Sequence, residues 1–72
     1  MGKISISVVC PTYNSERYIK RTLEMLLKQK KLPNEVIFCD DGSNDNTLKI
    51  LNIYSNIFKK KKIRFKLIKS RH

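Results

Sequence analysis

One stretch constrains the fold of this chain more than any other: an apolar run at residues 36–39 that ends in two adjacent aspartates and a glycine. An apolar run bounded by turn residues indicates a strand buried on both faces. Gly42 permits a tight turn, and Asp45 can cap a following helix by accepting amide hydrogens of its first turn. The stretch therefore predicts strand, acidic turn and helix. Asp40 and Asp41 would lie at the carboxyl end of the strand, where open α/β sheets bind ligands.

Hydrophobic patterning assigns the remaining elements. Runs of β-branched and apolar residues indicate strands, and apolar residues that recur every three or four positions indicate helices. The first strand is expected to end before Pro11, which removes a backbone donor, and the last strand alternates apolar and basic residues, as at a sheet edge. The predicted elements are strands at residues 4–10, 35–40 and 63–69 and helices at about residues 15–30 and 45–57.

The order of these elements predicts an α/β fold. A β-α-β-α-β chain with short connections forms a parallel sheet, here in the order 3-2-1, and right-handed crossovers place both helices on one face. This is half of a doubly wound sheet. With 72 residues, the chain makes one partial domain, whose second sheet face and first strand lack a cover. We therefore expect the amino-terminal piece of a longer protein, or assembly with a second copy through the exposed first strand.

The two cysteines and the amino-terminal sequence indicate the cellular compartment of the protein. Cys10 and Cys39 have no metal-ligand spacing, so they are expected to be buried reduced thiols of an intracellular protein, or else a disulfide between neighbouring strands. No apolar run approaches the ~18 residues of a membrane span, and no signal peptide precedes the first strand. Gly2 resembles a myristoylation site, but Ile6 stands where that pattern requires Ser or Thr. We expect a cytoplasmic protein, with a peripheral position at the inner face of the membrane as the alternative.

The formal net charge of +10 has two explanations. Lysine, isoleucine and asparagine are all frequent, as A/T-rich coding would produce, so compositional bias is the simpler one. The other is a polyanionic partner, either nucleic acid or an anionic membrane surface. The run Lys59–Lys62 is then either a solvated connection or a phosphate or lipid contact. It contains no aromatic residue for base stacking, which disfavours nucleic acid.

Polar side chains gather where the first two strands end. Parallel neighbouring strands place their following loops side by side, which is a default small-molecule site. Helix amino-termini favour phosphate, but carboxylates favour a donor such as a ribose hydroxyl or a base imide. A carboxylate that accepts from uracil N3–H rejects cytosine, because two acceptors would face each other. From the residues alone, Asp41 is either such a ligand contact or a stabiliser of its own turn.

Two motifs carry a family resemblance, Val8–Glu16 and Asp40–Thr47, in order on consecutive strand ends. Together they resemble the start of the family 2 glycosyltransferases, which have the GT-A fold and transfer sugars from nucleotide diphosphate donors. The resemblance implies that the nucleotide pocket is lined by Pro11, Thr12, Tyr13 and Asn14, with Glu16 near the base or ribose and Asp41 receiving the base imide hydrogen. The resemblance leaves a supporting role for Asp40, Gly42, Ser43 and Asp45, and Thr47 is expected to pack in the first turn of its helix.

The chain also departs from that family. No Asp or Glu follows Asp45, whereas the metal-binding Asp-x-Asp and the catalytic base lie downstream in such enzymes. We therefore assign no catalytic residue and no metal ligand, and expect a divalent cation, Mg²⁺ or Mn²⁺, only in a full-length parent. The expected function is the nucleotide-binding half of a transferase that moves a hexose from a UDP-sugar to a hydroxyl acceptor, inactive alone. The alternatives are a basic module that binds nucleic acid or an anionic membrane surface, and a self-associating fragment without a ligand.

Overall fold

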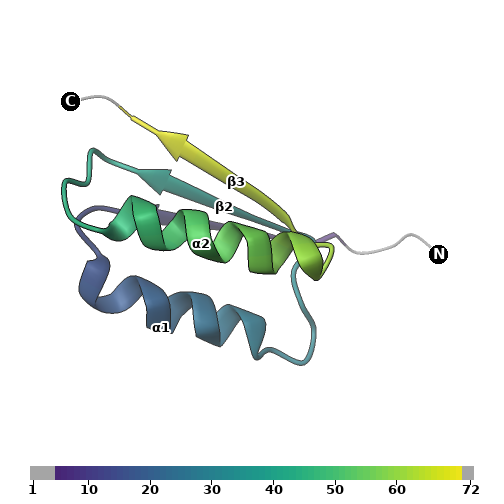
Figure 1. Cartoon of the computed structure of the whole chain (residues 1–72). Helices are drawn as coiled ribbons and strands as arrows, with labels where there is room; N and C mark the ends of the chain where they lie inside the picture. Colours follow the sequence, from purple (N-terminus) through teal and green to yellow (C-terminus); the bar gives the residue numbers. More distant parts are fainter. Residues whose placement is uncertain (1–4, 71–72) are drawn as a thin grey trace.

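A computed structural model describes residues 5–70 and has the predicted order of elements. These are β1 (Ser7–Thr12), α1 (Glu16–Leu27), β2 (Glu35–Asp40), α2 (Thr47–Lys60) and β3 (Arg64–Lys69). The three strands form one parallel sheet in the order β1-β2-β3. Both helices lie side by side over one face of it (Figure 1). The α/β class, the strand order and the one-sided helix layer are therefore confirmed, as half of a GT-A-type sheet.

The first strand runs further than predicted. β1 begins at Ser7 and passes through Pro11 to Thr12, whereas the sequence predicted an end before the proline; Ile4 lies outside the described residues. The carbonyl of Thr12 accepts the amide of Asp41 at 2.9 Å, so Thr12 faces β2. Alternate residues of a parallel strand face opposite sides, so the nitrogen of Pro11 faces the free edge, where a missing donor has no cost.

Both helices end elsewhere than predicted. α1 stops at Leu27, short of Lys30, because the amide of Lys28 bonds to the carbonyls of both Glu24 and Met25 and closes the last turn. α2 starts at Thr47 rather than Asp45 and continues to Lys60 rather than Ile57. The lysine run is therefore partly helical and is not merely a connection.

A Schellman motif fixes the end of α2. The amide of Ile63 donates to the carbonyl of Phe58, and that of Lys62 to the carbonyl of Lys59, both within 3.0 Å. Phe58 and Ile63 are both buried, which adds the hydrophobic contact typical of this motif. Lys62 has φ 62°, a left-handed conformation in which glycine is the usual residue.

Replacing Lys62 with glycine is expected to stabilise the fold. The left-handed conformation costs a residue with a Cβ atom about 1 kcal/mol or more, and glycine avoids this cost. The midpoint of urea denaturation of Lys62→Gly should therefore rise. The control is Lys60→Gly, at a helical position, whose midpoint should fall by a similar amount because glycine is a poor helix former. A lower midpoint for Lys62→Gly would contradict this description of the helix end.

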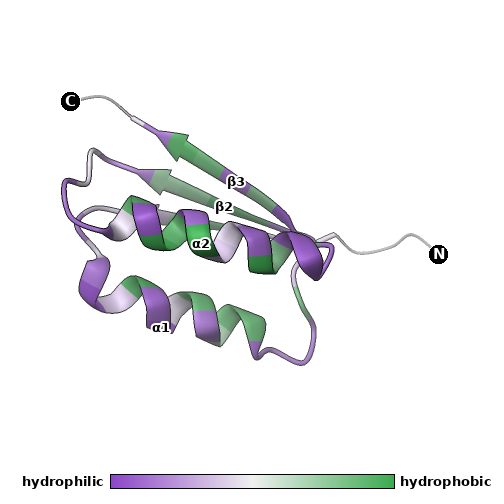
Figure 2. Cartoon of the chain, viewed as in Figure 1, coloured by the Kyte–Doolittle hydropathy of each residue, from purple (hydrophilic) through white to green (hydrophobic). Residues whose placement is uncertain are grey.

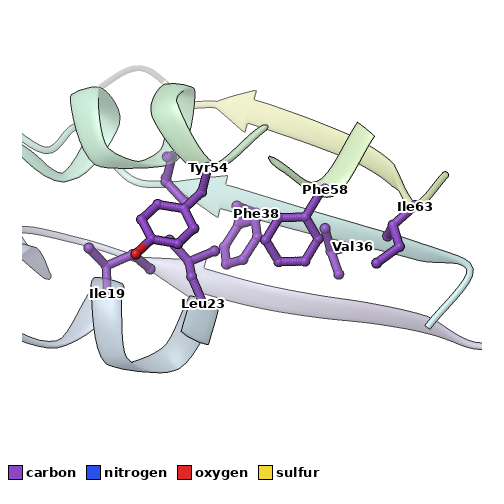
Figure 3. Close-up of a cluster of buried hydrophobic side chains, with 8 residues drawn as sticks. Ile19, Leu23, Val36, Phe38, Tyr54, Phe58 and Ile63 are labelled. Carbon is purple, nitrogen blue, oxygen red and sulfur yellow. The ribbon is translucent and has the colours of Figure 1, made fainter. Parts of the chain in front are cut away.

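The core lies between the helix layer and the sheet. It consists of Ile19 and Leu23 of α1, Val36 and Phe38 of β2, Leu51, Tyr54 and Phe58 of α2, and Ile63 (Figure 3). The ring of Phe65 lies 5.3 Å from that of Phe38 and 5.5 Å from that of Phe58, between ring centroids. The hydroxyl of Tyr54 donates to Glu24 at 2.7 Å, which links α2 to α1.

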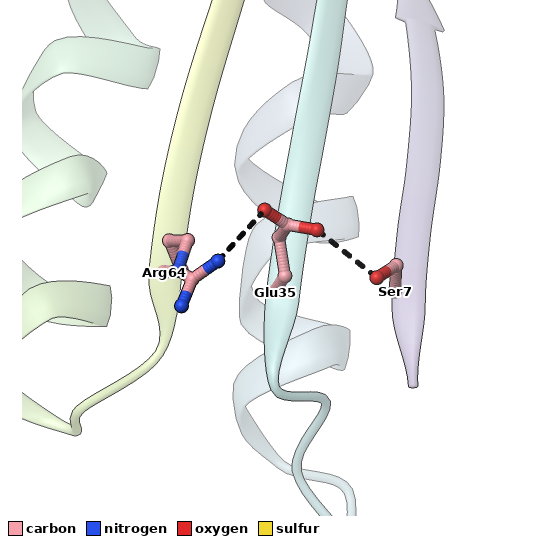
Figure 4. Close-up of polar contacts among 3 residues, drawn as sticks. All are labelled: Ser7, Glu35 and Arg64. Carbon is pink, nitrogen blue, oxygen red and sulfur yellow. Dashed lines mark hydrogen bonds and ion pairs between the residues drawn. The ribbon is translucent and has the colours of Figure 1, made fainter. Parts of the chain in front are cut away.

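The second face of the sheet has no covering layer in the described residues. Val36 and Phe38 are buried on the helix side, whereas Ile37 and Cys39 on the other side are only partly buried. The prediction that the central strand is buried on both faces is therefore wrong. At one end of this face, Glu35 accepts a hydrogen bond from Ser7 at 3.0 Å and pairs with Arg64 at 3.9 Å (Figure 4).

The two cysteines do not form a disulfide. Cys10 pairs in register with Phe38, and Cys39 with Pro11, so the two side chains alternate onto opposite faces of the sheet. Both thiols are free. Burial, and secondarily the neighbouring Cys39, raise the pKa of Cys10, which keeps that thiol protonated.

Both helices are amphipathic, with polar residues alternating around an apolar stripe (Figure 2). Among residues 5–70, neither helix is long and apolar enough to cross a membrane. The stripes explain why the helices pack on the sheet, because each buries one face.

Candidate functional site

The loops that follow β1 and β2 meet at the carboxyl edge of the sheet. Thr12 pairs in register with Asp40, and Asp40 with Lys69. The three strands therefore end together, and the two loops are in direct hydrogen-bond contact. Four of the six acidic residues of the chain belong to this edge: Glu16, Asp40, Asp41 and Asp45.

Asp40 is the buried centre of this edge. Its side chain is 1% exposed and accepts hydrogen bonds from the hydroxyl of Thr12 at 2.7 Å and from the hydroxyl and amide of Ser43 at 2.6 and 2.8 Å. Burial alone would raise the pKa of Asp40, but the bonds from Ser43 and Thr12 outweigh it and hold the pKa below its ordinary value. Asp40 therefore stays ionised and braces both loops.

Thr12 is part of this brace. It is 4% exposed, and its hydroxyl is donated to Asp40. The family resemblance implies that Thr12 lines a nucleotide pocket. In the structure the side chain of Thr12 is buried against Asp40. Its contribution to a ligand site is to hold the neighbouring loop in place.

The two loops also interlock through hydrogen bonds from backbone amides of one loop to side chains of the other. The amide of Asn14 donates to the hydroxyl of Ser43 at 2.8 Å, and the amide of Asn44 donates to the Asn14 side chain at 2.9 Å. The amide of Ser15 donates to the hydroxyl of Thr47 at 2.8 Å. Asn14 has φ 44°, a left-handed conformation that asparagine tolerates better than most residues. Residues far apart in the sequence thus fix one another.

Each helix start is capped by an acid from the other loop. Asp45 accepts the amide of Glu16 at 3.2 Å, and Glu16 accepts the amide of Asn46 at 3.0 Å. The sequence predicted Asp45 as the cap of its own helix, but the N-cap position is Asn46. Asp45 nevertheless accepts the amide of Thr47 at 2.9 Å, so one carboxylate serves both helices. Ser15 is the N-cap of α1, and its hydroxyl bonds to Tyr13 instead of to the helix.

The pKa of Asp45 is also held below its ordinary value. Burial would raise it, but the hydroxyl and amide of Thr47 and the amide of Glu16 all donate to the carboxylate. Thr47 is fully buried. These contacts give Asp45 and Thr47 a bracing position between the loops.

Asp41 is placed differently, on the outer surface of the edge. Its amide donates to the carbonyl of Thr12 at 2.9 Å, and its carboxylate accepts the hydroxyl of Ser70 at 2.9 Å. The side chain is exposed. A carboxylate can accept about four hydrogen bonds, so the bond from Ser70 orients Asp41 and is compatible with a ligand contact.

Ser70 is the site residue that sequence reasoning missed. It follows β3, and its amide donates to the carbonyl of Asp40 at 2.9 Å, which brings its hydroxyl to Asp41. The position of Ser70 could have been predicted from the third parallel strand. The carboxyl end of that strand must lie at the same edge of the sheet as those of the other two.

The accessible part of the edge is an open ledge. Its exposed members are Pro11, Tyr13, Asn14, Glu16, Asp41 and Gly42. Gly42 has φ 80°, the left-handed turn for which a glycine was expected. Residues 5–70 enclose no pocket, because the two loops bond to each other. The two loops form one joint surface, as their mutual hydrogen bonds show.

The described residues of the ledge form no metal-ligand cluster of their own. In the described part of the chain, no three His, Cys, Asp or Glu side chains gather closely enough to hold one. Asp40 and Asp45 are occupied by hydrogen bonds from the loops. A cation such as Mg²⁺ keeps several waters and takes one or two carboxylates together with substrate phosphates.

Stability should fall in acid because of the two bracing carboxylates. The pKa values of Asp40 and Asp45 are lowered in the fold, so the unfolded chain binds protons more readily than the folded one. This stabilisation is complete above about pH 4, the ordinary pKa of aspartate, and is lost as the pH falls below it. The urea midpoint should therefore drop in acid. In Asp45→Asn, the midpoint should depend less steeply on pH. A midpoint that rises in acid would contradict the assignment.

Comparison with known proteins finds relatives for this chain. The family model described as "Glycosyl transferase family 2" matches residues 7–72. The chain is 42% identical over 52 residues to a chondroitin synthase of Pasteurella multocida (strain Pm70). It is 47% identical over 55 residues to the poly(ribitol-phosphate) beta-N-acetylglucosaminyltransferase TarS of Staphylococcus aureus (strain Mu50). It is 42% identical over 53 residues to a validoxylamine A glucosyltransferase of Streptomyces hygroscopicus subsp. limoneus.

These matches cover 71%, 74% and 71% of this chain, but only 5%, 10% and 12% of the respective relatives. The chain therefore spans a small part of the length of these enzymes. No solved structure matches it. Since the family model extends over residues 7–72 and the relatives are glycosyltransferases, the chain belongs to glycosyl transferase family 2.

Proposed function

We propose that this chain binds the nucleotide part of a UDP-sugar on the ledge formed by its two loops. The observation that carries the proposal is the position of Asp41, exposed at the carboxyl end of the central strand. Its backbone is tied to Thr12 and its carboxylate to Ser70, so the group is oriented before a ligand arrives. Membership of a glycosyltransferase family supports a nucleotide-sugar as that ligand.

Asp41 would select uridine by hydrogen-bond polarity. Uracil presents an N3–H donor, which a carboxylate accepts, whereas cytosine presents an acceptor at the same position. Two acceptors facing each other lose the bond and leave both groups desolvated and unpaired. A uridine nucleotide should therefore bind more tightly than the matching cytidine nucleotide.

The neighbouring exposed residues supply the rest of the nucleoside contact. The ring of Tyr13 is 58% exposed and offers a flat apolar surface, and Glu16 carries acceptors that suit ribose hydroxyls. Asn14 and Pro11 complete the exposed ledge. Two of the relatives are a glucosyltransferase and an N-acetylglucosaminyltransferase, which supports a hexose as the sugar.

Transfer itself would need residues beyond those described. In the parent reaction, an acceptor hydroxyl oxygen bonds to the anomeric carbon, the bond from that carbon to the diphosphate oxygen breaks, and a base takes the hydroxyl proton. The described acids at the ledge are engaged as braces or as the base contact. The chain by itself is therefore proposed to bind the donor weakly and to transfer no sugar.

Calorimetric titration with UDP and CDP tests this proposal. The chain should bind UDP about tenfold more tightly than CDP, because the hydrogen bond made to uracil is replaced by two facing acceptors with cytosine. Asp41→Ala should weaken UDP binding and remove the preference. The control is Glu35→Ala, which removes the same charge from the amino end of the same strand. It should change neither the affinity for UDP nor the preference for UDP over CDP. If Asp41→Ala keeps the full preference for UDP, Asp41 does not read the base.

A further inference from the structure

A dense group of lysines lies at the end of the molecule opposite the ledge. Both helices run antiparallel to the strands and end there (Figure 1). Lys28 caps the end of α1, and Lys61 caps the end of α2. The amide of Arg64 donates to the carbonyl of Asn34 at 3.0 Å, which ties together the segments that follow the two helices. We name this group the basic pole; its members, all exposed, are Lys28, Lys30, Lys31, Lys59, Lys60, Lys61 and Lys62.

The charge of the molecule is therefore polarised. Four of the six acids lie at the carboxyl edge of the sheet, while seven lysines form the basic pole. Of the other two acids, Glu35 pairs with Arg64, and Glu24, one helical turn before Lys28, accepts the hydroxyl of Tyr54. Compositional bias explains how many lysines the chain contains, but it does not explain their position. The helix dipole favours a few cations at a carboxyl end, whereas seven like charges repel one another.

One lysine of the pole stands at a backbone position that disfavours it. Lys62 has φ 62° at the end of the Schellman motif, where glycine would relieve a cost of about 1 kcal/mol. Neither stability nor the helix dipole accounts for a lysine there. A requirement for positive charge at the surface does account for it.

We propose that the basic pole docks the protein on an anionic lipid surface. Lysine ammonium groups are strongly hydrated point charges that attract a plane of negative charge without requiring a defined geometry. Residues 28–34 and 59–64 contain no aromatic side chain to stack on bases. Membrane attachment at this end would leave the ledge, at the other end of the strands, facing water.

Apolar side chains on α2 favour lipid further. Ile53 and Ile57 are 56% and 37% exposed, and their spacing of four residues places them on one face of the helix. Lys60 follows three residues later on the same face. Exposed isoleucines next to a lysine on one helix face suit the boundary between lipid headgroups and acyl chains. Nucleic acid has no apolar layer that these isoleucines could enter.

Co-sedimentation with lipid vesicles tests the proposal on the full chain. Vesicles in which about one lipid in three is phosphatidylglycerol should bind the chain at low salt and release it at high salt, and pure phosphatidylcholine vesicles should bind it poorly. Replacing Lys59–Lys62 with glutamine should weaken binding at least about a hundredfold, because each lysine contributes about a factor of five. The matched control, with glutamine at Arg17, Lys20, Arg21 and Lys66, removes the same charge elsewhere and should weaken binding less than about tenfold.

Lys62→Gly separates docking from folding. This variant is expected to be more stable than the parent chain and yet to bind phosphatidylglycerol vesicles about fivefold more weakly, so misfolding cannot explain the loss. Equal losses in the pole variant and its control would overturn the proposal, because net charge alone would then drive binding. Tighter binding to duplex DNA than to the vesicles would also overturn it. UDP affinity should be the same in the pole variant and the parent chain, since the two surfaces lie at opposite ends.

Discussion

Replacing Phe38 with alanine is expected to unfold the chain. Phe38 is fully buried in the central strand, and its ring lies 5.3 Å from that of Phe65. Removing a buried phenylalanine side chain costs about 3–5 kcal/mol, and a domain of this size rarely has more than about 3–5 kcal/mol of stability. The far-ultraviolet circular dichroism of the variant should show a largely unfolded chain without denaturant.

The matched control for this experiment lies on the opposite face of the sheet. Val9 is 62% exposed on β1, so Val9→Ala should leave the urea midpoint nearly unchanged. A large loss of stability in Val9→Ala would show that the open sheet face is covered in solution, as assembly with a second copy would do. That assembly stays a prediction. β1 and β3 are both edge strands, so each has one side free to pair with a second copy.

Replacing Asp40 with alanine should have the second largest effect, and it should act on the ledge as well as on the fold. The substitution leaves the hydroxyl of Thr12 and the amide and hydroxyl of Ser43 without their acceptor. Unpaired buried donors cost about 1–3 kcal/mol each when no water replaces the partner. We expect a loss of about 3 kcal/mol in the free energy of unfolding, together with loss of UDP binding.

Asp40→Asn separates charge from hydrogen bonding. Asparagine keeps one acceptor but presents an NH₂ group where the amide of Ser43 donates, so it should recover only part of the lost stability. Urea denaturation measures both variants. If Asp40→Ala is as stable as the parent chain, the carboxylate does not brace the loops.

The sequence predicted the elements that depend on local patterns. The helical spacing of apolar residues, the apolar central strand and the glycine turn at Gly42 all appear in the structure. Element ends were less predictable. Pro11 continues its strand because the strand lies at an edge, and α2 runs on because Phe58 must reach the core. Both outcomes are set by tertiary contacts that no local pattern reveals.

The candidate site was likewise predictable only in part. The position of Asp41 and the bracing contacts of Asp40 follow from a strand that ends in two carboxylates. The reciprocal capping by Glu16 and Asp45 and the contact of Ser70 join residues 29 or 30 positions apart. Such contacts depend on how two loops pack against each other, and a single sequence contains no direct signal of them.

The most direct test of the ledge is an amide chemical-shift titration of the isotope-labelled chain with UDP. If the two loops form one nucleotide site, the largest shifts should occur together at residues 13–16 and 41–47, with no change at Lys28 or Lys59–Lys62. Shifts confined to those lysines would show that the diphosphate is held by charge alone. The ledge would then not be a nucleoside site.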